Sequence, residues 1–149
     1  MPANTSPIYS IVGAVDSAAA NNAGAVAGIT ANTATDGSGT LTKIFTAGAN
    51  GSYVQKIRFR PVASSAGSVA ATVARVFISS SSTTSITNTW LYDEITLPAV
   101  TMSNTAASSV FELPLNIALD PNYLLYVTFG TSTGSTPSGY SVVVIAGDY

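Results

Sequence analysis

The stretch that decides the fold runs over Leu41–Arg60 and reads LTKIFTAGANGSYVQKIRFR. It predicts a strand, a Gly/Asn turn and a second strand, because two apolar, β-branched runs flank residues that tolerate positive φ. In the second strand Lys56, Arg58 and Arg60 alternate with apolar residues, so the basic side chains should share one face. Three of the five basic residues of the chain therefore form one row, which favours docking over catalysis.

The composition of the 149-residue chain favours one folded β domain of low charge. Charged residues make up 8% of the sequence, against about a quarter in typical domains. Val, Ile, Thr and Tyr are plentiful, and strands are enriched in these residues. The surface must then consist mostly of hydroxyl, amide and backbone groups, and a surface with so few charges associates easily.

Missing residue types argue against several kinds of function. The chain has no Cys and no His, so it lacks thiolate metal ligands, disulfides and the commonest general base. A net charge of −2 gives no general attraction to nucleic acid. The first ten residues, MPANTSPIYS, resemble no signal peptide, and no apolar run is long enough to span a membrane. We therefore expect no catalytic residue, cofactor or metal, and no nucleic-acid, membrane or small-molecule partner.

Apolar alternation broken by turn residues recurs along the chain and predicts eight to nine short strands. Strands with this spacing indicate an all-β, antiparallel sandwich or barrel. Of these we favour a jelly-roll-like β-sandwich, because two four-stranded sheets fit the number of strands. We expect residues 1–31 to form an extended N-terminal arm and connection, and residues 32–149 to form the β-sandwich domain. The candidate strands are Ile8–Val15, Ala25–Thr30, Leu41–Thr46, Tyr53–Arg60, Thr72–Ile78, Thr89–Leu97, Ser109–Leu113, Tyr123–Phe129 and Tyr140–Ile145.

The core should form from strand positions on one face of each predicted strand. By contrast, the run SSSSTTS at residues 79–85 predicts a mobile, solvent-facing loop. The predicted core residues are Ile57, Phe59, Val76, Ile78, Ile95, Leu97, Phe111, Leu113, Leu125, Val127, Phe129, Val142 and Val144.

The acidic residues do not form a recognisable catalytic or metal site. Asp93 and Glu94 are adjacent on a predicted strand, so they should point to opposite faces as solvated or ion-paired residues. Asp36 begins a fragment similar to a calcium loop, but the further acids of such a loop are missing and a turn is predicted instead. No nucleophile elbow, phosphate loop or dinucleotide fingerprint is present, and we do not expect an enzyme.

The basic row and three aromatic residues are the candidate contact sites. Lys56, Arg58 and Arg60 either form a solvated outer face that discourages edge pairing, or bind carboxylates of another protein subunit. Single-strand nucleic acid is disfavoured, because no aromatic residues interleave with these cations.

Trp90, Tyr92 and Tyr9 either pack in the core or act as interface anchors, since buried aromatic residues dominate many protein interfaces.

Five segments carry a family resemblance: Asn32–Ser65, Val73–Ile78 (VARVFI), Tyr92–Ser103 (YDEITLPAVTMS), Phe111–Gly130 and Tyr140–Tyr149 (YSVVVIAGDY). Through them, most of the chain after about residue 32 resembles the small β-sandwich head decoration, or cement, proteins of tailed bacteriophages. This resemblance implies a jelly-roll subunit, commonly a homotrimer, that binds the major capsid protein on the outer surface of the virion after assembly in the host cytoplasm. It implies a role in stabilising the capsid by bridging capsomers.

For such a capsid contact, the N-terminal residues Pro7, Ile8 and Tyr9 are the first candidates and the basic row is the second. The alternative function is a carbohydrate- or receptor-binding module of a phage fibre, spike or tail. It predicts an exposed aromatic residue with polar neighbours, either Trp90 or Tyr140.

Overall fold

The computed structural model describes residues 30–64, 67–134 and 138–149. All regular structure in these residues is β, and the predicted strand Ile8–Val15 and nearly all of Ala25–Thr30 lie outside them. The strands are β1 (Thr42–Thr46), β2 (Ser52–Val62), β3 (Ser68–Val69), β4 (Thr72–Ser79), β5 (Thr89–Leu97), β6 (Val100–Thr101), β7 (Phe111–Leu119), β8 (Leu124–Phe129) and β9 (Gly139–Asp148).

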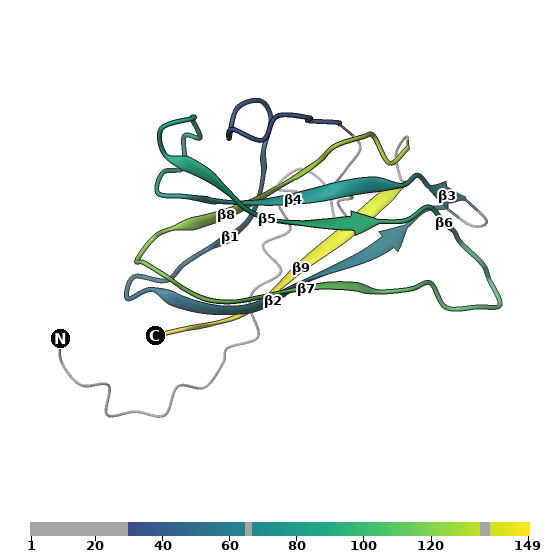
Figure 1. Cartoon of the computed structure of the whole chain (residues 1–149). Coiled ribbons are helices and arrows are strands. Elements are labelled where there is room, and N and C mark those ends of the chain that lie inside the picture. Colours follow the sequence, from purple (N-terminus) through teal and green to yellow (C-terminus); the bar gives the residue numbers. More distant parts are fainter. Residues whose placement is uncertain (1–29, 65–66, 135–137) are drawn as a thin grey trace.

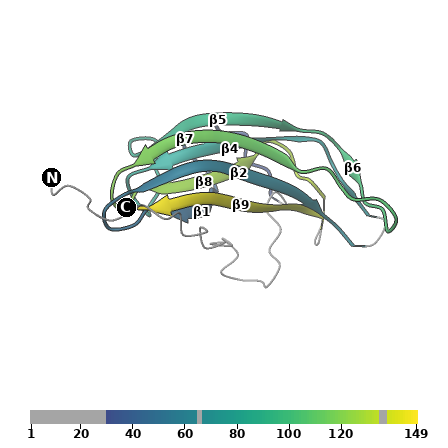
Figure 2. The ribbon, with the colours of Figure 1, turned by 90° about the horizontal axis from the view of Figure 1, so that it is seen from below.

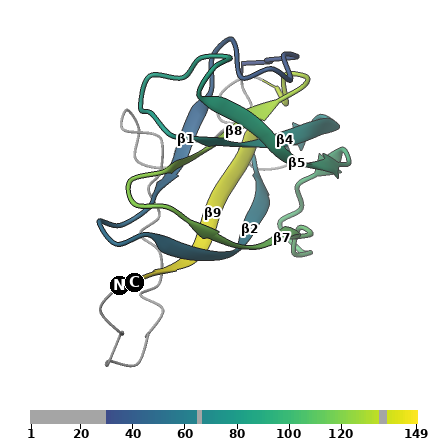
Figure 3. The ribbon, with the colours of Figure 1, turned by 60° about the vertical axis from the view of Figure 1, so that its left-hand side comes forward.

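The strands form two sheets that pack face to face as a sandwich (Figure 1). The four-stranded sheet has the order β1-β8-β4-β5, and the three-stranded sheet has the order β7-β2-β9. A separate two-stranded ribbon pairs β3 with β6, and all strand pairs are antiparallel. Figure 3 shows the two layers from another side. The predicted all-β sandwich is confirmed, but the described strands do not form the two four-stranded sheets that were expected.

The decisive stretch Leu41–Arg60 connects the two layers. Its first strand, β1, pairs with β8, whereas its second strand, β2, lies between β7 and β9 in the other sheet. The turn between them places Gly51 at φ +89°, where a side chain would be strained, and the Gly51 N–H donates to the Gly48 carbonyl at 3.0 Å. The two strands therefore belong to different sheets and do not form a hairpin.

One hydrophobic core fills the space between the sheets, and every predicted core residue lies in it or packs against it. Phe59 of β2 meets Phe129 of β8 edge to face, with ring centroids 6.4 Å apart. Tyr140 of β9 stacks on the same Phe129 ring at 5.9 Å. These three rings tie strands of both sheets together.

A second, smaller cluster consists of Phe77, Leu124 and Tyr126, with Leu41 packed against it. Phe77 and Tyr126 are directly paired across β4 and β8, and their neighbours along each strand belong to the main core. The cluster therefore lies on the outer face of the four-stranded sheet, because successive side chains alternate between faces.

The serine-rich loop after β4 forms hydrogen bonds within itself and with the four-stranded sheet. Tyr126 donates its hydroxyl to the Ser82 carbonyl at 3.2 Å, and the Ser79 hydroxyl donates to the Ser81 and Asn88 carbonyls at 2.8 and 3.0 Å. The Asn88 side chain also donates to the Thr83 carbonyl at 2.9 Å. Beyond the buried Ser79 the loop residues are exposed or partly exposed, in agreement with the predicted solvent-facing loop, and their polar groups form a hydrogen-bond network.

Strand β7 is longer than the predicted segment Ser109–Leu113 and continues through Pro114. Proline lacks the N–H that a central strand needs, but β7 is an edge strand paired with β2 alone among the described strands. A bulge lies at this point, between the pairs of Val54 and Lys56.

Candidate functional site

The basic row lies on the outer face of the three-stranded sheet, as predicted. Ile57 and Phe59 are fully buried, whereas Arg58 and Arg60 are exposed and Lys56 is partly exposed. However, β2 is the central strand of its sheet, so these charges cannot protect a free edge. The suggestion that the row discourages edge pairing was therefore wrong, and the row is a sheet-face feature.

Glu112 of β7 engages two of the three cations in this row. Its Oε2 lies 2.9 Å from Lys56 Nζ, and its Oε1 lies 3.0 Å from Arg58 Nε. The hydrogen bond from Lys56 holds the pKa of Glu112 below its ordinary value, and the charges of Lys56 and Arg58 act in the same direction. The pairing across β2 and β7 could not be known from sequence, so Glu112 did not appear as a candidate.

Arg60 is the third cation of the basic row, and the ion pairs of Glu112 do not include it. Its neighbour across the β2–β9 pair is Ser141, and within the described residues no hydrogen bond or ion pair engages the Arg60 side chain. A free guanidinium can form paired hydrogen bonds with a carboxylate. Of the predicted basic row, Arg60 is therefore best placed to contact another molecule.

The second candidate surface is the outer edge of the four-stranded sheet. Strand β5 is the last strand of that sheet, and its residues Trp90, Leu91 and Tyr92 are 48%, 37% and 42% exposed. We call these three residues the aromatic edge. Trp90 and Tyr92 are thus solvent-exposed, which is the condition for interface anchors, whereas Tyr9, Pro7 and Ile8 lie outside the described residues.

A β-bulge lies within the aromatic edge. Across the β4–β5 pair, Phe77 faces Leu91 and Val76 faces Asp93, which leaves Tyr92 as the extra residue on β5. A bulge of this kind adds one residue to a strand and increases its twist. Before the bulge, Trp90 pairs with Ile78 and Leu91 with Phe77, so these two exposed side chains lie on opposite faces of the sheet at its edge.

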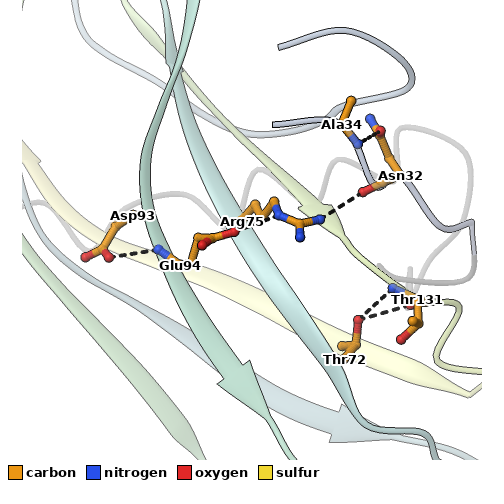
Figure 4. Close-up of polar contacts among 7 residues, drawn as sticks. All are labelled: Asn32, Ala34, Thr72, Arg75, Asp93, Glu94 and Thr131. Atoms are coloured by element: carbon orange, nitrogen blue, oxygen red, sulfur yellow. Dashed lines mark hydrogen bonds and ion pairs between the residues drawn. The ribbon is translucent and has the colours of Figure 1, made fainter. Parts of the chain in front are cut away.

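The acidic pair that follows points in two directions (Figure 4). Glu94 Oε1 lies 2.7 Å from Arg75 Nε, and Arg75 Nη1 donates to the Asn32 carbonyl at 3.3 Å. Asp93 instead accepts the Glu94 backbone N–H at 2.8 Å and pairs with the core residue Val76. The two carboxylates are therefore not a facing pair, as the sequence predicted, and Glu94 is held in an ion pair.

The calcium-like fragment is a turn. Asp36 Oδ1 accepts the Ser38 N–H at 3.0 Å and the Ser38 hydroxyl at 2.6 Å. The hydrogen bond from the Ser38 hydroxyl, followed by that from its backbone, lowers the pKa of Asp36. Within the part of the chain that the structure describes, no three His, Cys, Asp or Glu side chains gather as a metal site would require.

Tyr140, one of two residues considered for sugar stacking, is a core residue. It is fully buried against Phe129, and its hydroxyl donates to the Pro98 carbonyl at 3.2 Å. Burial raises the pKa of this tyrosine. The expectation that Tyr140 could be an exposed platform is therefore wrong, and Trp90 alone keeps that possibility.

No helix within residues 30–64, 67–134 and 138–149 is long and apolar enough to cross a membrane. Comparison of the chain with protein-family models, with curated proteins and with solved structures finds no match.

Proposed function

We propose that this chain is a non-enzymatic capsid decoration, or cement, subunit of a tailed bacteriophage. It would bind the major capsid protein on the outer surface of the virion and stabilise the shell by bridging capsomers. The observation that carries this proposal is the aromatic edge, because Trp90 and Tyr92 are exposed on a strand whose outer side pairs with no other strand of the described residues. Exposed aromatic residues at such positions are typical of surfaces that a partner completes.

The arrangement of the charges supports a binding role over a catalytic one. Glu112 is bonded to Lys56 and Arg58, and Glu94 to Arg75, so these carboxylates are occupied in ion pairs. Surface pairs of this kind contribute little to stability, and on the outer face of the three-stranded sheet one carboxylate meets three cations, so this face keeps an excess of positive charge. The proposed contact therefore combines the apolar aromatic edge with a cationic face, on which Arg60 supplies a directional charge.

The finer parts of the proposal follow the family resemblance. They are a jelly-roll-like topology, an extended N-terminal arm over residues 1–31, a homotrimer, and contact of Pro7, Ile8 and Tyr9 with the capsid lattice. A lattice supplies many copies of each contact, so that individually weak contacts together hold the subunit in place. Deleting residues 1–10 should abolish capsid binding and leave the β-fold intact, which circular dichroism would check. Unchanged binding would contradict the role of the arm.

The direct test is co-sedimentation with capsids of the encoding phage that were prepared without this protein. The wild type should bind saturably, and Trp90→Ala and Arg60→Ala should each bind more weakly, Trp90→Ala by about tenfold or more. Tyr149→Ala is the matched control, since Tyr149 is 43% exposed and lies at the C-terminus, outside β5. Absence of saturable binding by the folded wild type would refute the capsid role.

The alternative is a carbohydrate- or receptor-binding module. It is favoured by the exposed Trp90 ring together with Asp93, a partly buried carboxylate on the same strand that could bind sugar hydroxyls. A glycan array probed with the wild type and with Trp90→Ala separates the two functions. Hits that vanish in the variant, without capsid binding, would replace the decoration role.

A further inference from the structure

The two sheets differ in how far their outer faces are covered. On the four-stranded sheet, the outward residues Phe77, Tyr126 and Thr128 are buried, at 1%, 5% and 3% exposure. On the three-stranded sheet, the outward residues Arg58 and Arg60 are exposed. In Figure 2 the strands of this second sheet lie side by side in the order β7, β2, β9. Among the described residues, its outer face is therefore the open one.

The arginines of the two faces differ in the same way. Arg75, on the covered face, has a side chain only 17% exposed and is ion-paired with Glu94. The Arg58 side chain is 47% exposed, and Glu112 engages its Nε alone. Within the described residues no contact engages the Nη groups of Arg58 or any part of the Arg60 guanidinium. These groups are available to a partner.

The two arginines are held on a rigid support. Strand β2 is paired on both sides, with β7 and with β9, and the alternate residues Ile57 and Phe59 are fully buried in the core. Arg58 and Arg60 are two positions apart, so their Cα atoms are separated by about 6.7 Å along the strand. A support that is already ordered lowers the entropic cost of binding.

Positive charge is concentrated on this face of an otherwise acidic chain. Of the described residues on this face, the basic row and Glu112 carry charge, which gives an excess of two positive charges. The chain has five basic and seven acidic residues in all, so its other residues include two basic and six acidic ones, with a net charge of −4. This distribution attracts an acidic partner to one face and repels it from the others.

Aliphatic side chains lie beside the basic row. Across the β2–β9 pair, Ile145 is opposite Lys56 and Val143 is opposite Arg58, and both aliphatic residues are partly exposed. The open face therefore presents cations on one strand and apolar surface on the next.

We infer that this open face binds an acidic protein surface that presents two carboxylates about 7 Å apart beside aliphatic groups. Arg60 binds one carboxylate with paired hydrogen bonds, and Arg58 binds the other through its Nη groups. Val143 and Ile145 pack against the aliphatic groups. The inference rests on the proposed function only for the identity of the partner, which is then the major capsid protein. The aromatic edge keeps its place in that contact.

A protein surface fits this face better than a nucleic acid does. No aromatic ring interleaves with the cations of the basic row, whereas single-strand binders use such rings to stack bases. A long phosphate chain would also meet the acidic remainder of the molecule, whereas a local acidic patch meets the open face alone.

Variants that change the charge of this face test the inference on capsids prepared without this protein. Arg60→Glu should weaken co-sedimentation with capsids by about tenfold or more. Glu112→Gln removes the carboxylate that competes for Arg58 and should strengthen binding by about two- to fivefold. Asp120→Asn is its matched control, because it makes the same change of charge at an exposed position outside the strands, and it should bind like the wild type. Circular dichroism checks that each variant is folded.

A second readout needs no capsids. A short polyglutamate peptide, added to the isotope-labelled full-length protein, should shift the backbone amide NMR signals of residues 56–60 and 141–145. Polyglutamine of the same length should shift none of them. Raising the salt concentration from about 50 mM to about 500 mM should weaken polyglutamate binding by about tenfold or more.

Three results would each overturn the inference. They are capsid binding by Arg60→Glu equal to that of the wild type, equal binding by Glu112→Gln and Asp120→Asn, and polyglutamate shifts centred outside residues 56–60 and 141–145. The capsid role fails in a different way. If the folded wild type ignores capsids while polyglutamate shifts residues 56–60, the capsid role is refuted and the acidic-partner inference stands.

Discussion

Tyr140 stacks on Phe129 with ring centroids 5.9 Å apart and ring planes 7° from parallel. The two residues belong to β9 and β8, which lie in different sheets, so the ring pair joins the two layers of the sandwich. The Tyr140 hydroxyl reaches the Pro98 carbonyl just after β5, so a third segment is fixed by the same side chain.

Two replacements of Tyr140 should separate the contribution of the stacked ring from that of the hydroxyl hydrogen bond. Tyr140→Phe keeps the stacked ring and loses one hydrogen bond, which should cost about 0.5–1.5 kcal/mol of unfolding free energy. Tyr140→Ala removes a fully buried ring and should cost about 3–5 kcal/mol. Urea denaturation measures both variants. Equal losses for Phe and Ala would show that the ring contact contributes little.

The outer cluster of the four-stranded sheet gives a different prediction. Phe77 is 1% exposed and contacts Leu124 and Tyr126 beneath the serine-rich loop. Phe77→Ala should destabilise the protein by about 3–5 kcal/mol and speed amide exchange in residues 79–88, because Tyr126 would lose its fixed position. Hydrogen exchange read by mass spectrometry tests this, with Ile86→Ala, at a 65% exposed site, as the control. If amide exchange in residues 79–88 is the same in Phe77→Ala as in the wild type, the outer cluster does not hold the loop in place.

Gly51 should tolerate no side chain. Its φ is +89°, and a Cβ there would lie 2.6 Å from the Leu119 carbonyl oxygen. Gly51→Ala should lose about 1–2 kcal/mol from backbone strain alone, with the steric contact adding to the loss. Asn tolerates positive φ better than Ala, so Gly51→Asn distinguishes the two causes in thermal unfolding. If Gly51→Asn has wild-type stability, backbone strain accounts for the whole loss in Gly51→Ala. The close approach of the Cβ to the Leu119 carbonyl oxygen then contributes nothing.

The ion pairs of Glu112 predict a pH dependence. Its pKa is lowered in the folded state from an ordinary value of 4.5, so its contribution is present above that value and is lost as pH falls through the folded pKa. The difference in unfolding midpoint between the wild type and Glu112→Gln should be fully present well above pH 4.5 and should disappear as the pH falls through the lowered folded-state pKa of Glu112. High salt should shrink it as well. A difference independent of both pH and salt would contradict an ionic origin.

Local pattern was sufficient to predict the seven longer strands of the described residues and the core, but not the two-residue strands β3 and β6. The bounds of Thr89–Leu97 agree with β5, because its ends are marked by buried residues and turn residues. The alternation of Arg58 with Ile57 and Phe59 correctly predicted which face of β2 is buried. These features depend on neighbours within a few positions along the chain.

Features that depend on which strands pair could not be predicted from the sequence. The partner of Lys56 and Arg58 is Glu112, more than fifty residues away, and only the β2–β7 register brings them together. Phe77 lies within a continuous apolar run, so the sequence did not indicate that it faces outward. Tyr140 was a candidate for an exposed ring with polar neighbours, but its ring is buried in the core and the Pro98 carbonyl accepts its hydroxyl.

The measurement that tests the capsid role most directly is the heat resistance of capsids lacking this protein, titrated with the purified chain. Genome release on heating, followed with a DNA-binding dye, should shift to higher temperature and saturate at a fixed number of chains per capsid. Trp90→Ala should require about tenfold more protein for the same shift, and Tyr149→Ala should match the wild type. A release temperature that stays constant at saturating concentrations of folded protein would contradict the account.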